Sequence, residues 1–311
     1  MDTLTIDRDI KNKIEKLSFF IGNTPLFPIE NIYKKKDVNI YAKIEWQQLG
    51  NSIKSRPAFE MIKKAIETGE LDKHKIIIDA SSGNTGIAYA SIGAFLGIRV
   101  KLILPYNISK EKILILKSLN ADIEVVSEIY GSEGSQKRVE EIVDSNPAKY
   151  FYINQYSNKE NYKSHFKTAA EIFKQTKGDV THFVAGLGTS GTFTGNSMFL
   201  KQKNKNIKTI ALQPANVKNI LFGWKYYTGK NTPAIYNNSL VDDTIRINDA
   251  EVEQIIKQTA ATEGLLLSPS SAGNLAGAIK VAKNIEKGTI VTVFPDGHDK
   301  YYSFLEKILN K

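Results

Sequence analysis

The stretch Phe183-Val184-Ala185-Gly186-Leu187-Gly188-Thr189-Ser190-Gly191-Thr192 is the part of this sequence that decides its fold class. An apolar run passes into a loop of glycine, serine and threonine, and a helical pattern begins directly after the loop. Small residues let backbone N–H groups approach an anion, hydroxyls add donors, and the helix dipole favours negative charge. The loop lacks the lysine of a P-loop and the later acidic residue of a dinucleotide fingerprint, so it fits a monophosphate best. A tight strand-to-helix turn that binds nothing explains the same residues.

Strand and helix patterns alternate outward from this stretch, from about residue 38 to the end. The predicted strands are 39–45, 75–80, 100–104, 123–126, 182–185, 207–212 and 289–294. The predicted helices are 56–67, 85–96, 110–119, 136–143, 159–175, 191–201, 249–262 and 272–285. Several strands are apolar on both faces, as in a parallel sheet covered by helices, and the alternation favours βαβ units. We therefore predict two doubly wound α/β lobes with a ligand cleft at the carboxyl ends of their strands.

A second loop, Ser81-Ser82-Gly83-Asn84-Thr85-Gly86, also stands between a predicted strand and a predicted helix. Hydroxyls, an amide and several N–H groups converge at one helix N-terminus, an arrangement that suits a carboxylate. A serine or threonine helix cap with a glycine turn is the alternative interpretation.

A third loop, 50–58, places Lys54 at the start of a predicted helix, with Pro57 in the first helical turn. The helix dipole is unfavourable for a cation there and would lower the pKa of the amine, which favours a Schiff-base nucleophile. A surface lysine fits the same pattern.

Composition excludes several other chemistries. The chain of 311 residues has no cysteine, which removes disulfides and thiol nucleophiles, and its four histidines are too scattered to suggest a metal cluster. Its net charge of +9 comes from lysines spread along the chain, a pattern more typical of solvated helix ends than of nucleic-acid binding. No apolar stretch approaches the roughly 20 residues of a membrane span, and residues 1–7 have no signal-peptide pattern. We expect a cytoplasmic protein that binds small molecules, and neither nucleic acid nor membranes.

Taken in order, these loops resemble the fold-type II pyridoxal-phosphate enzymes, in the branch of cysteine synthase (O-acetylserine sulfhydrylase) and cystathionine β-synthase. The matching stretches are 21–26, 52–56, 81–86, 155–158, 186–195, 263–264 with 270–271, and 294–297. The resemblance implies a two-lobed α/β fold like that of the tryptophan synthase β subunit, each lobe a twisted, mostly parallel sheet flanked by helices. It implies a smaller mobile lobe, 48–158, with the Schiff-base lysine and the carboxylate-binding loop. The larger lobe, 1–47 plus 159–311, would hold the phosphate loop.

The resemblance also implies a role for each matching residue. Lys54 would be the catalytic lysine that binds pyridoxal 5'-phosphate covalently, Asn84 would lie beside its phenolic oxygen, and Ser270 would meet its pyridine nitrogen. The groups that would cradle its phosphate are Gly188, Thr189, Ser190, Gly191 and Thr192. The groups that would bind the substrate α-carboxylate are Ser81, Ser82, Thr85 and Gln155. No metal is implied.

The implied reaction is β-replacement on an activated serine, O-acetylserine or O-phosphoserine, with sulfide giving L-cysteine through an aminoacrylate intermediate. Lys54 would remove and return protons. A serine at the ring nitrogen does not stabilise a pyridinium as a carboxylate would, which favours elimination and replacement over transamination. The family resemblance further implies a homodimer.

The segment 221–227 is bulkier than the small glycine-rich loop common in enzymes that use O-acetylserine, and Lys225 in it could meet a substrate phosphate. Related reactions therefore stay open. They are cystathionine synthesis, cysteine desulfhydration, serine dehydration and diaminopropionate-type synthesis.

Overall fold

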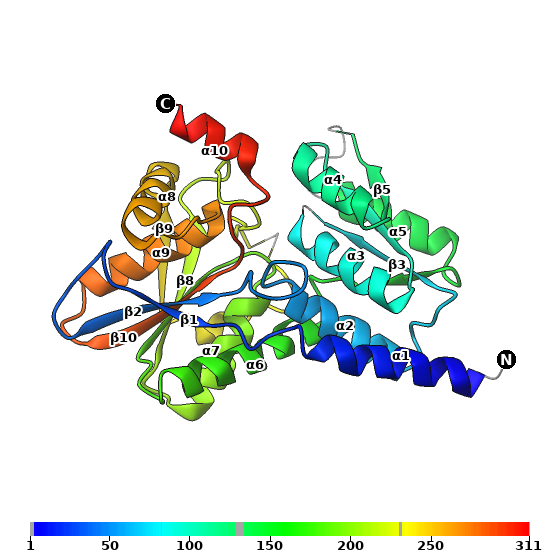
Figure 1. The fold of residues 1–311 in the computed structure, drawn as a ribbon, viewed down its shortest axis with the longest axis horizontal. Coiled ribbons are helices and arrows are strands. Elements are labelled where there is room, and N and C mark those ends of the chain that lie inside the picture. The colour runs from blue at the N-terminus through cyan, green and yellow to red at the C-terminus, as the bar shows by residue number, and fades with distance from the viewer. Residues whose placement is uncertain (1–2, 82, 128–133, 230–231, 311) are drawn as a thin grey trace. The chain divides into compact units, whose positions relative to one another are not determined.

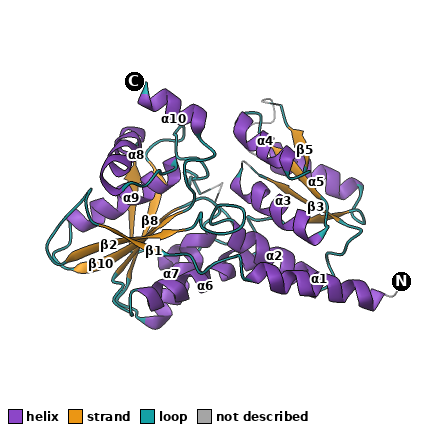
Figure 2. Ribbon diagram, viewed as in Figure 1, coloured by secondary structure: helices purple, strands orange, loops and turns teal. Residues whose placement is uncertain are grey.

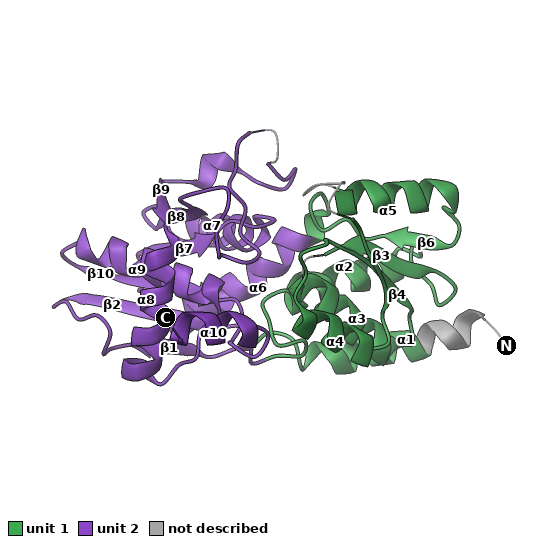
Figure 3. Cartoon of the chain, turned by 90° about the horizontal axis from the view of Figure 1, so that it is seen from above, with its two compact units in different colours: residues 1–22, 48–160 green, residues 23–47, 161–311 purple. Residues whose placement is uncertain are grey.

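The computed structural model describes residues 3–81, 83–127, 134–229 and 232–310 (Figure 1). The chain divides into two compact units, shown in green and purple in Figure 3. Unit 1 comprises residues 1–22 and 48–160, and unit 2 comprises residues 23–47 and 161–311. In both units the strands lie between helices (Figure 2).

Unit 1 is built on a four-stranded sheet with the order β5-β4-β3-β6, in which all neighbours are parallel. Its strands are β3 (Ile76–Ala80), β4 (Val100–Leu104), β5 (Asp122–Val125) and β6 (Tyr150–Tyr152). Its helices are α1 (Thr3–Ser18), α2 (Ser55–Glu67), α3 (Asn84–Leu96), α4 (Lys110–Ser118) and α5 (Gly134–Ser145).

The central strands of unit 1 are buried on both faces. Ile77 and Leu102 belong to a core cluster that includes side chains of α1 to α4, whereas their neighbours Ile78 and Ile103 pack in a second cluster with Val139 of α5. Successive residues of a strand point to opposite faces, so an apolar run is what a sheet covered on both sides requires.

Unit 2 is built on a six-stranded sheet with the order β1-β2-β10-β7-β8-β9. Its strands are β1 (Leu26–Ile29), β2 (Val38–Ile44), β7 (His182–Gly186), β8 (Lys208–Pro214), β9 (Asp243–Ile247) and β10 (Gly288–Phe294). Only the β1–β2 pair is antiparallel among these strand pairs. The helices are α6 (Lys159–Gln175), α7 (Gly191–Lys203), α8 (Asp249–Glu263), α9 (Pro269–Lys283) and α10 (Tyr302–Leu309), with a 3-10 turn η2 (Asn238–Leu240). In Figure 1, α8 and α9 lie on one side of the sheet and α6 and α7 on the other.

The predicted α/β class with mostly parallel sheets is confirmed. Each predicted strand and helix corresponds to an element of the structure, with bounds that differ by a few residues. Six elements of the described residues were not predicted: α1, β1, β6, η2, β9 and α10.

A buried ion pair holds the segment that opens unit 2. Lys43 of β2 is fully buried, and its Nζ lies 2.7 Å from Oε2 of Glu171 on α6. The other carboxylate oxygen of Glu171 accepts a hydrogen bond of 3.0 Å from the backbone N–H of Asn23. The Thr24 hydroxyl donates to Oε1 of the buried Glu45 over 2.7 Å. Buried charges persist only when they are paired, so we expect this network to be sensitive to the loss of one partner.

Candidate active site

The predicted phosphate loop connects β7 to α7 in unit 2. Ser190 is the residue before the helix and has a left-handed backbone (φ +70°), a conformation that is unfavourable for residues with a side chain and that clusters at ligand sites. Its Oγ is buried and has no hydrogen-bond partner among the described residues. A buried hydroxyl without a partner calls for a missing acceptor or donor. A phosphate oxygen at this helix N-terminus would supply it.

Neighbouring side chains support the phosphate loop. Asn161 Nδ2 donates to Thr189 Oγ1 over 3.3 Å, and Thr192 Oγ1 lies 3.3 Å from His165 Nε2. A Cβ at Gly191 would overlap the Asn161 carboxamide, and a Cβ at Gly188 would overlap the backbone oxygen of Gly223. The two glycines therefore let other segments of unit 2 pack directly against the loop, which fixes its shape for a ligand.

The segment 221–227 packs against this loop. The Lys225 backbone N–H donates to Leu187 O over 2.8 Å, and the Tyr227 hydroxyl donates to Gly188 O over 3.0 Å. The Trp224 ring occupies the space that a side chain at Gly186 or Gly273 would need. Sequence reasoning missed this packing, because the bulky residues stand far along the chain from the glycines that accommodate them.

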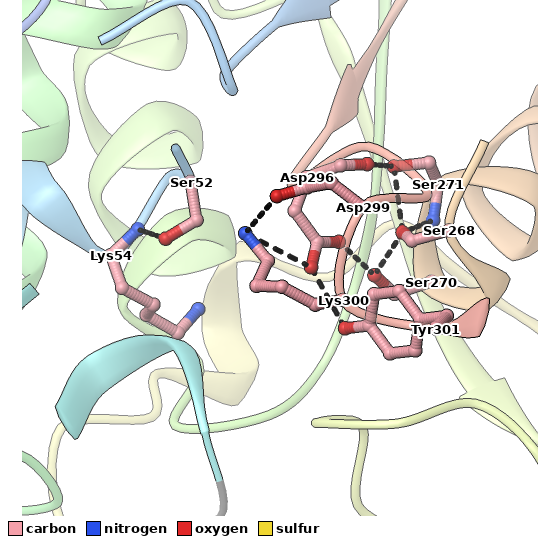
Figure 4. Close-up of polar contacts among 9 residues, drawn as sticks. All are labelled: Ser52, Lys54, Ser268, Ser270, Ser271, Asp296, Asp299, Lys300 and Tyr301. Atoms are coloured by element: carbon pink, nitrogen blue, oxygen red, sulfur yellow. Dashed lines mark hydrogen bonds and ion pairs between the residues drawn. The ribbon is translucent and has the colours of Figure 1, made fainter. Parts of the chain in front are cut away.

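Ser270 lies in the first turn of α9, where Ser268 caps the helix by accepting the Ser271 N–H over 3.2 Å. The Ser270 side chain is buried, and its hydroxyl donates to Asp296 Oδ1 over 3.3 Å (Figure 4). The other carboxylate oxygen of Asp296 accepts a 2.7 Å hydrogen bond from the Tyr301 hydroxyl. Asp296 follows β10 by two residues, so the structure places this polar cluster at the carboxyl end of a central strand.

Lys54 lies in unit 1 at the N-terminus of α2, as predicted, and is half-buried. The residues on either side of it, Ile53 and Ser55, are buried, and its backbone N–H donates to Ser52 Oγ over 3.3 Å (Figure 4). Pro57 stands in the first helical turn, where a missing N–H has no cost. The local structure therefore holds the lysine backbone rigidly.

The predicted carboxylate-binding loop follows β3 and opens α3. The Ser81 Oγ accepts two backbone hydrogen bonds, from Gly83 N–H over 3.2 Å and from Gly86 N–H over 2.8 Å. Within the described part of unit 1 its own hydroxyl hydrogen makes no hydrogen bond, so it is available to a ligand. Asn84 is the first residue of α3 and is half-buried. Ser82 lies outside the described residues.

Gln155 is brought to this loop from the segment after β6. Its Oε1 accepts from Thr85 Oγ1 over 2.9 Å, and its Nε2 donates to Ala80 O over 2.9 Å. The structure thus joins Thr85 and Gln155, which the resemblance assigned to the same ligand. The backbone N–H of Gln155 donates to Asp79 Oδ2 over 3.3 Å.

Two charged residues that sequence reasoning missed lie next to the carboxylate-binding loop. Asp79 is fully buried at the end of β3, and this burial raises the pKa of its carboxyl from 3.8 to about 7, although hydrogen bonds from Tyr89, Gln155 and Ala80 act in the opposite direction. The buried Lys112 of α4 lies against Gly83, where a Cβ would come within 2.9 Å of the lysine Cδ. An aspartate ending the apolar run of β3 was a visible signal, whereas the position of Lys112 depends on tertiary packing.

The described residues contain no group of three or more His, Cys, Asp and Glu side chains that could hold a metal ion. Across the same residues, no helix has both the length and the apolar character to cross a membrane.

The predicted site residues therefore belong to two sets: a lysine and the predicted carboxylate-binding loop in unit 1, and the predicted phosphate loop with a buried serine in unit 2. These are the groups that the resemblance assigns to a class of enzyme that binds a phosphorylated cofactor covalently and an amino acid through its carboxylate. The chain belongs to the family of pyridoxal-phosphate-dependent enzymes, whose profile matches residues 17–296. Its fold is the fold-type II architecture of the cysteine-synthase-like enzymes, and it is a β-replacement enzyme that uses pyridoxal 5'-phosphate.

Individual relatives cover nearly the whole chain. It is 38% identical over 303 residues to a cysteine synthase of Aquifex aeolicus, covering 95% of this chain and 93% of that protein. It is 33% identical over 300 residues to an O-acetylserine-dependent cystathionine beta-synthase of Bacillus subtilis, covering 93% of this chain and 96% of that protein. The crystal structure of a hydrogen sulfide-producing enzyme of Fusobacterium nucleatum superposes with a TM-score of 0.86 at 33% identity, covering 92% of this chain and 98% of that one.

Proposed function

We propose that this protein makes L-cysteine from sulfide and an activated serine, O-acetylserine or O-phosphoserine. The observation that carries the proposal lies in the predicted phosphate loop, where the buried Ser190 hydroxyl just before α7 has no hydrogen-bond partner among the described residues. The same chain has a lysine at the start of α2. The cysteine synthase relative of Aquifex aeolicus supports the choice of reaction.

Each site residue then has a role in the proposed reaction. When bound, pyridoxal 5'-phosphate withdraws electrons from the Cα of the attached amino acid. Lys54 holds the cofactor covalently, accepts the Cα proton of the substrate and later returns a proton to release the product. Asn84 contacts the phenolic oxygen, and Ser270 contacts the pyridine nitrogen.

The remaining residues bind anionic groups. The phosphate loop, Gly188 to Thr192, binds the cofactor phosphate through backbone N–H groups and hydroxyls. The Ser81 hydroxyl hydrogen, together with Ser82, Thr85 and Gln155, binds the substrate α-carboxylate. We further propose that the lobe of residues 48–158 closes on binding of this carboxylate and excludes water. The homodimer that the family resemblance implies and the cytoplasmic location that we expect from the sequence are part of the same proposal.

The test begins with the cofactor. The purified protein is incubated with pyridoxal 5'-phosphate, reduced with borohydride and digested, and the modified peptide is identified by mass spectrometry. We expect the modification at Lys54 and its loss in Lys54→Ala. Lys64→Ala is the matched control, because Lys64 is an exposed lysine on the same helix. Modification of another lysine in the unaltered protein would refute the assignment.

The substrates are tested next. O-acetylserine and O-phosphoserine are each supplied with sulfide, and L-cysteine is measured by chromatography and mass spectrometry. We expect one of the two serines to give cysteine and to shift the visible absorption of the bound cofactor. No shift with either would refute the substrate assignment.

The second candidate is a related β-elimination or β-replacement by the same residues. The similarity to the cystathionine beta-synthase of Bacillus subtilis and to the hydrogen sulfide-producing enzyme of Fusobacterium nucleatum supports this second candidate. Homocysteine and ammonia as acceptors, and cysteine or serine as sole substrate, separate these reactions by their products. A turnover with homocysteine higher than that with sulfide would favour cystathionine synthesis.

A further inference from the structure

The predicted phosphate loop directs two carbonyl oxygens toward the segment 221–227 of unit 2. Leu187 O accepts the Lys225 backbone N–H over 2.8 Å, and Gly188 O accepts the Tyr227 hydroxyl over 3.0 Å. A carbonyl oxygen can only accept hydrogen bonds, so each of these contacts fixes the direction of one carbonyl group. Both carbonyls are thereby held on the side of the loop that faces the segment 221–227.

The direction of each carbonyl also sets the direction of the N–H group that follows it. The C=O and the N–H of a planar trans peptide unit point to opposite sides, and all peptide bonds of the described residues are trans. Because Leu187 O is held by Lys225, the Gly188 N–H points away from the segment 221–227. Because Gly188 O is held by Tyr227, the Thr189 N–H points away from it as well.

These two N–H groups suit an anion on the opposite side of the loop. Gly188 is half-buried and Thr189 is buried, and neither backbone N–H has a hydrogen-bond partner among the described residues. Buried N–H groups are almost always paired, so both call for an acceptor. If either peptide unit turned over, a carbonyl oxygen with its partial negative charge would replace the donor and repel an anion.

The Tyr227 side chain is itself held in place within unit 2. The Tyr227 backbone N–H donates to Gln213 Oε1 over 3.3 Å, and the Tyr227 ring packs edge to face on the Tyr236 ring, with 5.1 Å between the ring centroids. The donor of Lys225 is a backbone group, which every residue except proline supplies. Of the two contacts with the loop carbonyls, only the one made by Tyr227 therefore depends on the identity of a side chain.

We propose that Tyr227 is a positioning residue, whose hydroxyl holds the Gly188 carbonyl toward the segment 221–227 so that the Thr189 N–H faces the phosphate of the bound cofactor. The inference rests on the proposed function, which assigns the loop from Gly188 to Thr192 to that phosphate. Tyr227 transfers no proton and acts on the affinity for the phosphate group, not for the cofactor ring. The bulky segment 221–227 thus contributes to cofactor binding, independently of the substrate.

The experiment compares pyridoxal 5'-phosphate with pyridoxal, which lacks the phosphate. The full-length protein is freed of bound cofactor, and the dissociation constants of both ligands are measured by fluorescence titration. We expect Tyr227→Phe to bind pyridoxal 5'-phosphate about threefold to tenfold more weakly, the usual effect of losing one hydrogen bond between neutral groups. We expect its affinity for pyridoxal to equal that of the unaltered protein. An equal loss for the two ligands would show a general structural defect and overturn the proposal.

Tyr236→Phe is the matched control for the loss of a tyrosine hydroxyl. Tyr236 packs on Tyr227, but its hydroxyl donates to Asn238 Oδ1 over 3.1 Å. The affinities of Tyr236→Phe for both ligands should therefore equal those of the unaltered protein. A loss of affinity for pyridoxal 5'-phosphate as large as that of Tyr227→Phe would contradict the role of the Tyr227 hydroxyl.

A measurement on the unaltered protein makes the test independent of how well the variant folds. The full-length chain is labelled with ¹⁵N-threonine, and the amide resonance of Thr189 is assigned with Thr189→Ser. We expect the Thr189 amide proton to move downfield on binding of pyridoxal 5'-phosphate but not of pyridoxal, because a hydrogen bond to a charged acceptor is short and strong. The same resonance position with both ligands would overturn the proposal.

The outcomes separate this inference from the proposed function. If the unaltered protein binds pyridoxal 5'-phosphate no more tightly than pyridoxal, the assignment of the loop to the phosphate fails, and the inference fails with it. If the unaltered protein prefers pyridoxal 5'-phosphate and Tyr227→Phe keeps the whole of that preference, only the role of Tyr227 is overturned.

Discussion

Replacing Asp79 by asparagine should stabilise unit 1, relative to the unaltered protein, more at neutral pH than at acidic pH. Burial is the largest influence on the Asp79 carboxyl and raises its pKa from 3.8 to about 7 in the folded chain. The unfolded chain therefore releases this proton near pH 4, whereas the folded chain keeps it until about pH 7. Between these values the folded state binds more protons, so its stability falls as the pH rises.

The magnitude follows from the size of the shift. A difference of about 3 pKa units at about 1.4 kcal/mol each amounts to about 4 kcal/mol, lost between pH 4 and pH 7 and constant above. Below pH 4 both states are protonated and Asp79 contributes nothing. An asparagine has no such titration. The stability of Asp79→Asn relative to the unaltered protein should thus increase by about 3 kcal/mol from pH 4.5 to pH 7.5.

The readout must report on unit 1, because a chain with two units need not unfold in a single step. Hydrogen exchange of the amides in β3 and α3, corrected for intrinsic exchange rates at each pH, gives an opening free energy for this region. Asparagine has one carbonyl oxygen where aspartate has two carboxylate oxygens, so the variant loses one hydrogen-bond acceptor. The resulting change in opening free energy is the same at every pH, and the prediction is therefore tested by the slope of the opening free energy against pH. Asp144→Asn, at an exposed position of α5, is the control and should leave the slope unchanged. A slope in Asp79→Asn equal to that of the unaltered protein would refute the reasoning.

Two further predictions concern unit 2. Ser190→Ala should weaken binding of pyridoxal 5'-phosphate by about tenfold or more, since a hydrogen bond to a charged group contributes about 1.5–3 kcal/mol. Ser197→Ala, which removes another buried hydroxyl of α7 without a described partner, should leave the affinity unchanged in the same fluorescence titration; equal losses would contradict the cradle. Glu171→Gln should destabilise the protein by about 3 kcal/mol, because it removes a carboxylate that lies 2.7 Å from the buried Lys43 ammonium. Glu251→Gln breaks a more exposed pair and should cost at most about 1 kcal/mol in thermal unfolding, and comparable losses in the two variants would contradict this argument.

The strands that the sequence missed, β1, β6 and β9, all lie at sheet edges, although the edge strand β5 was predicted. β10 is buried at every position, and its apolar run was recognised. β1 contains Pro28 and pairs on one side only, whereas β9 has Arg246 between apolar residues and also lies at an edge. Proline and alternating polarity are tolerated at edges, so such strands carry a weak signal. α1 did carry a signal, the buried Ile10, Ile14 and Leu17 at helical spacing, and the prediction simply began too late along the chain.

The predicted phosphate loop and the predicted carboxylate-binding loop could be located from the sequence because each follows a strand and opens a helix. Their supporting contacts could not, because they join segments far apart in the chain. Asn161 and Thr189 stand 28 residues apart, and Gln155 and Thr85 stand 70 apart. No local pattern specifies such pairs, since they arise only when the parallel strands bring their carboxyl ends together.

The two units share one arrangement, in which a buried aspartate accepts a hydrogen bond from a residue that we assign to a ligand. Asp79 accepts from the Tyr89 hydroxyl over 2.9 Å and from the Gln155 N–H, while Asp296 accepts from the Tyr301 hydroxyl and from Ser270.

The electrostatic settings differ, however. Burial dominates at Asp79, whose pKa is raised to about 7, whereas a lysine ammonium lies beside Asp296. An amide at position 79 should therefore relieve a desolvation penalty at neutral pH, whereas an amide at position 296 would remove an oxygen that accepts a hydrogen bond from Tyr301 or Ser270. If the stability of Asp79→Asn relative to the unaltered protein were the same at pH 7.5 as at pH 4.5, Asp79 would carry no such penalty and this contrast between the two aspartates would fail.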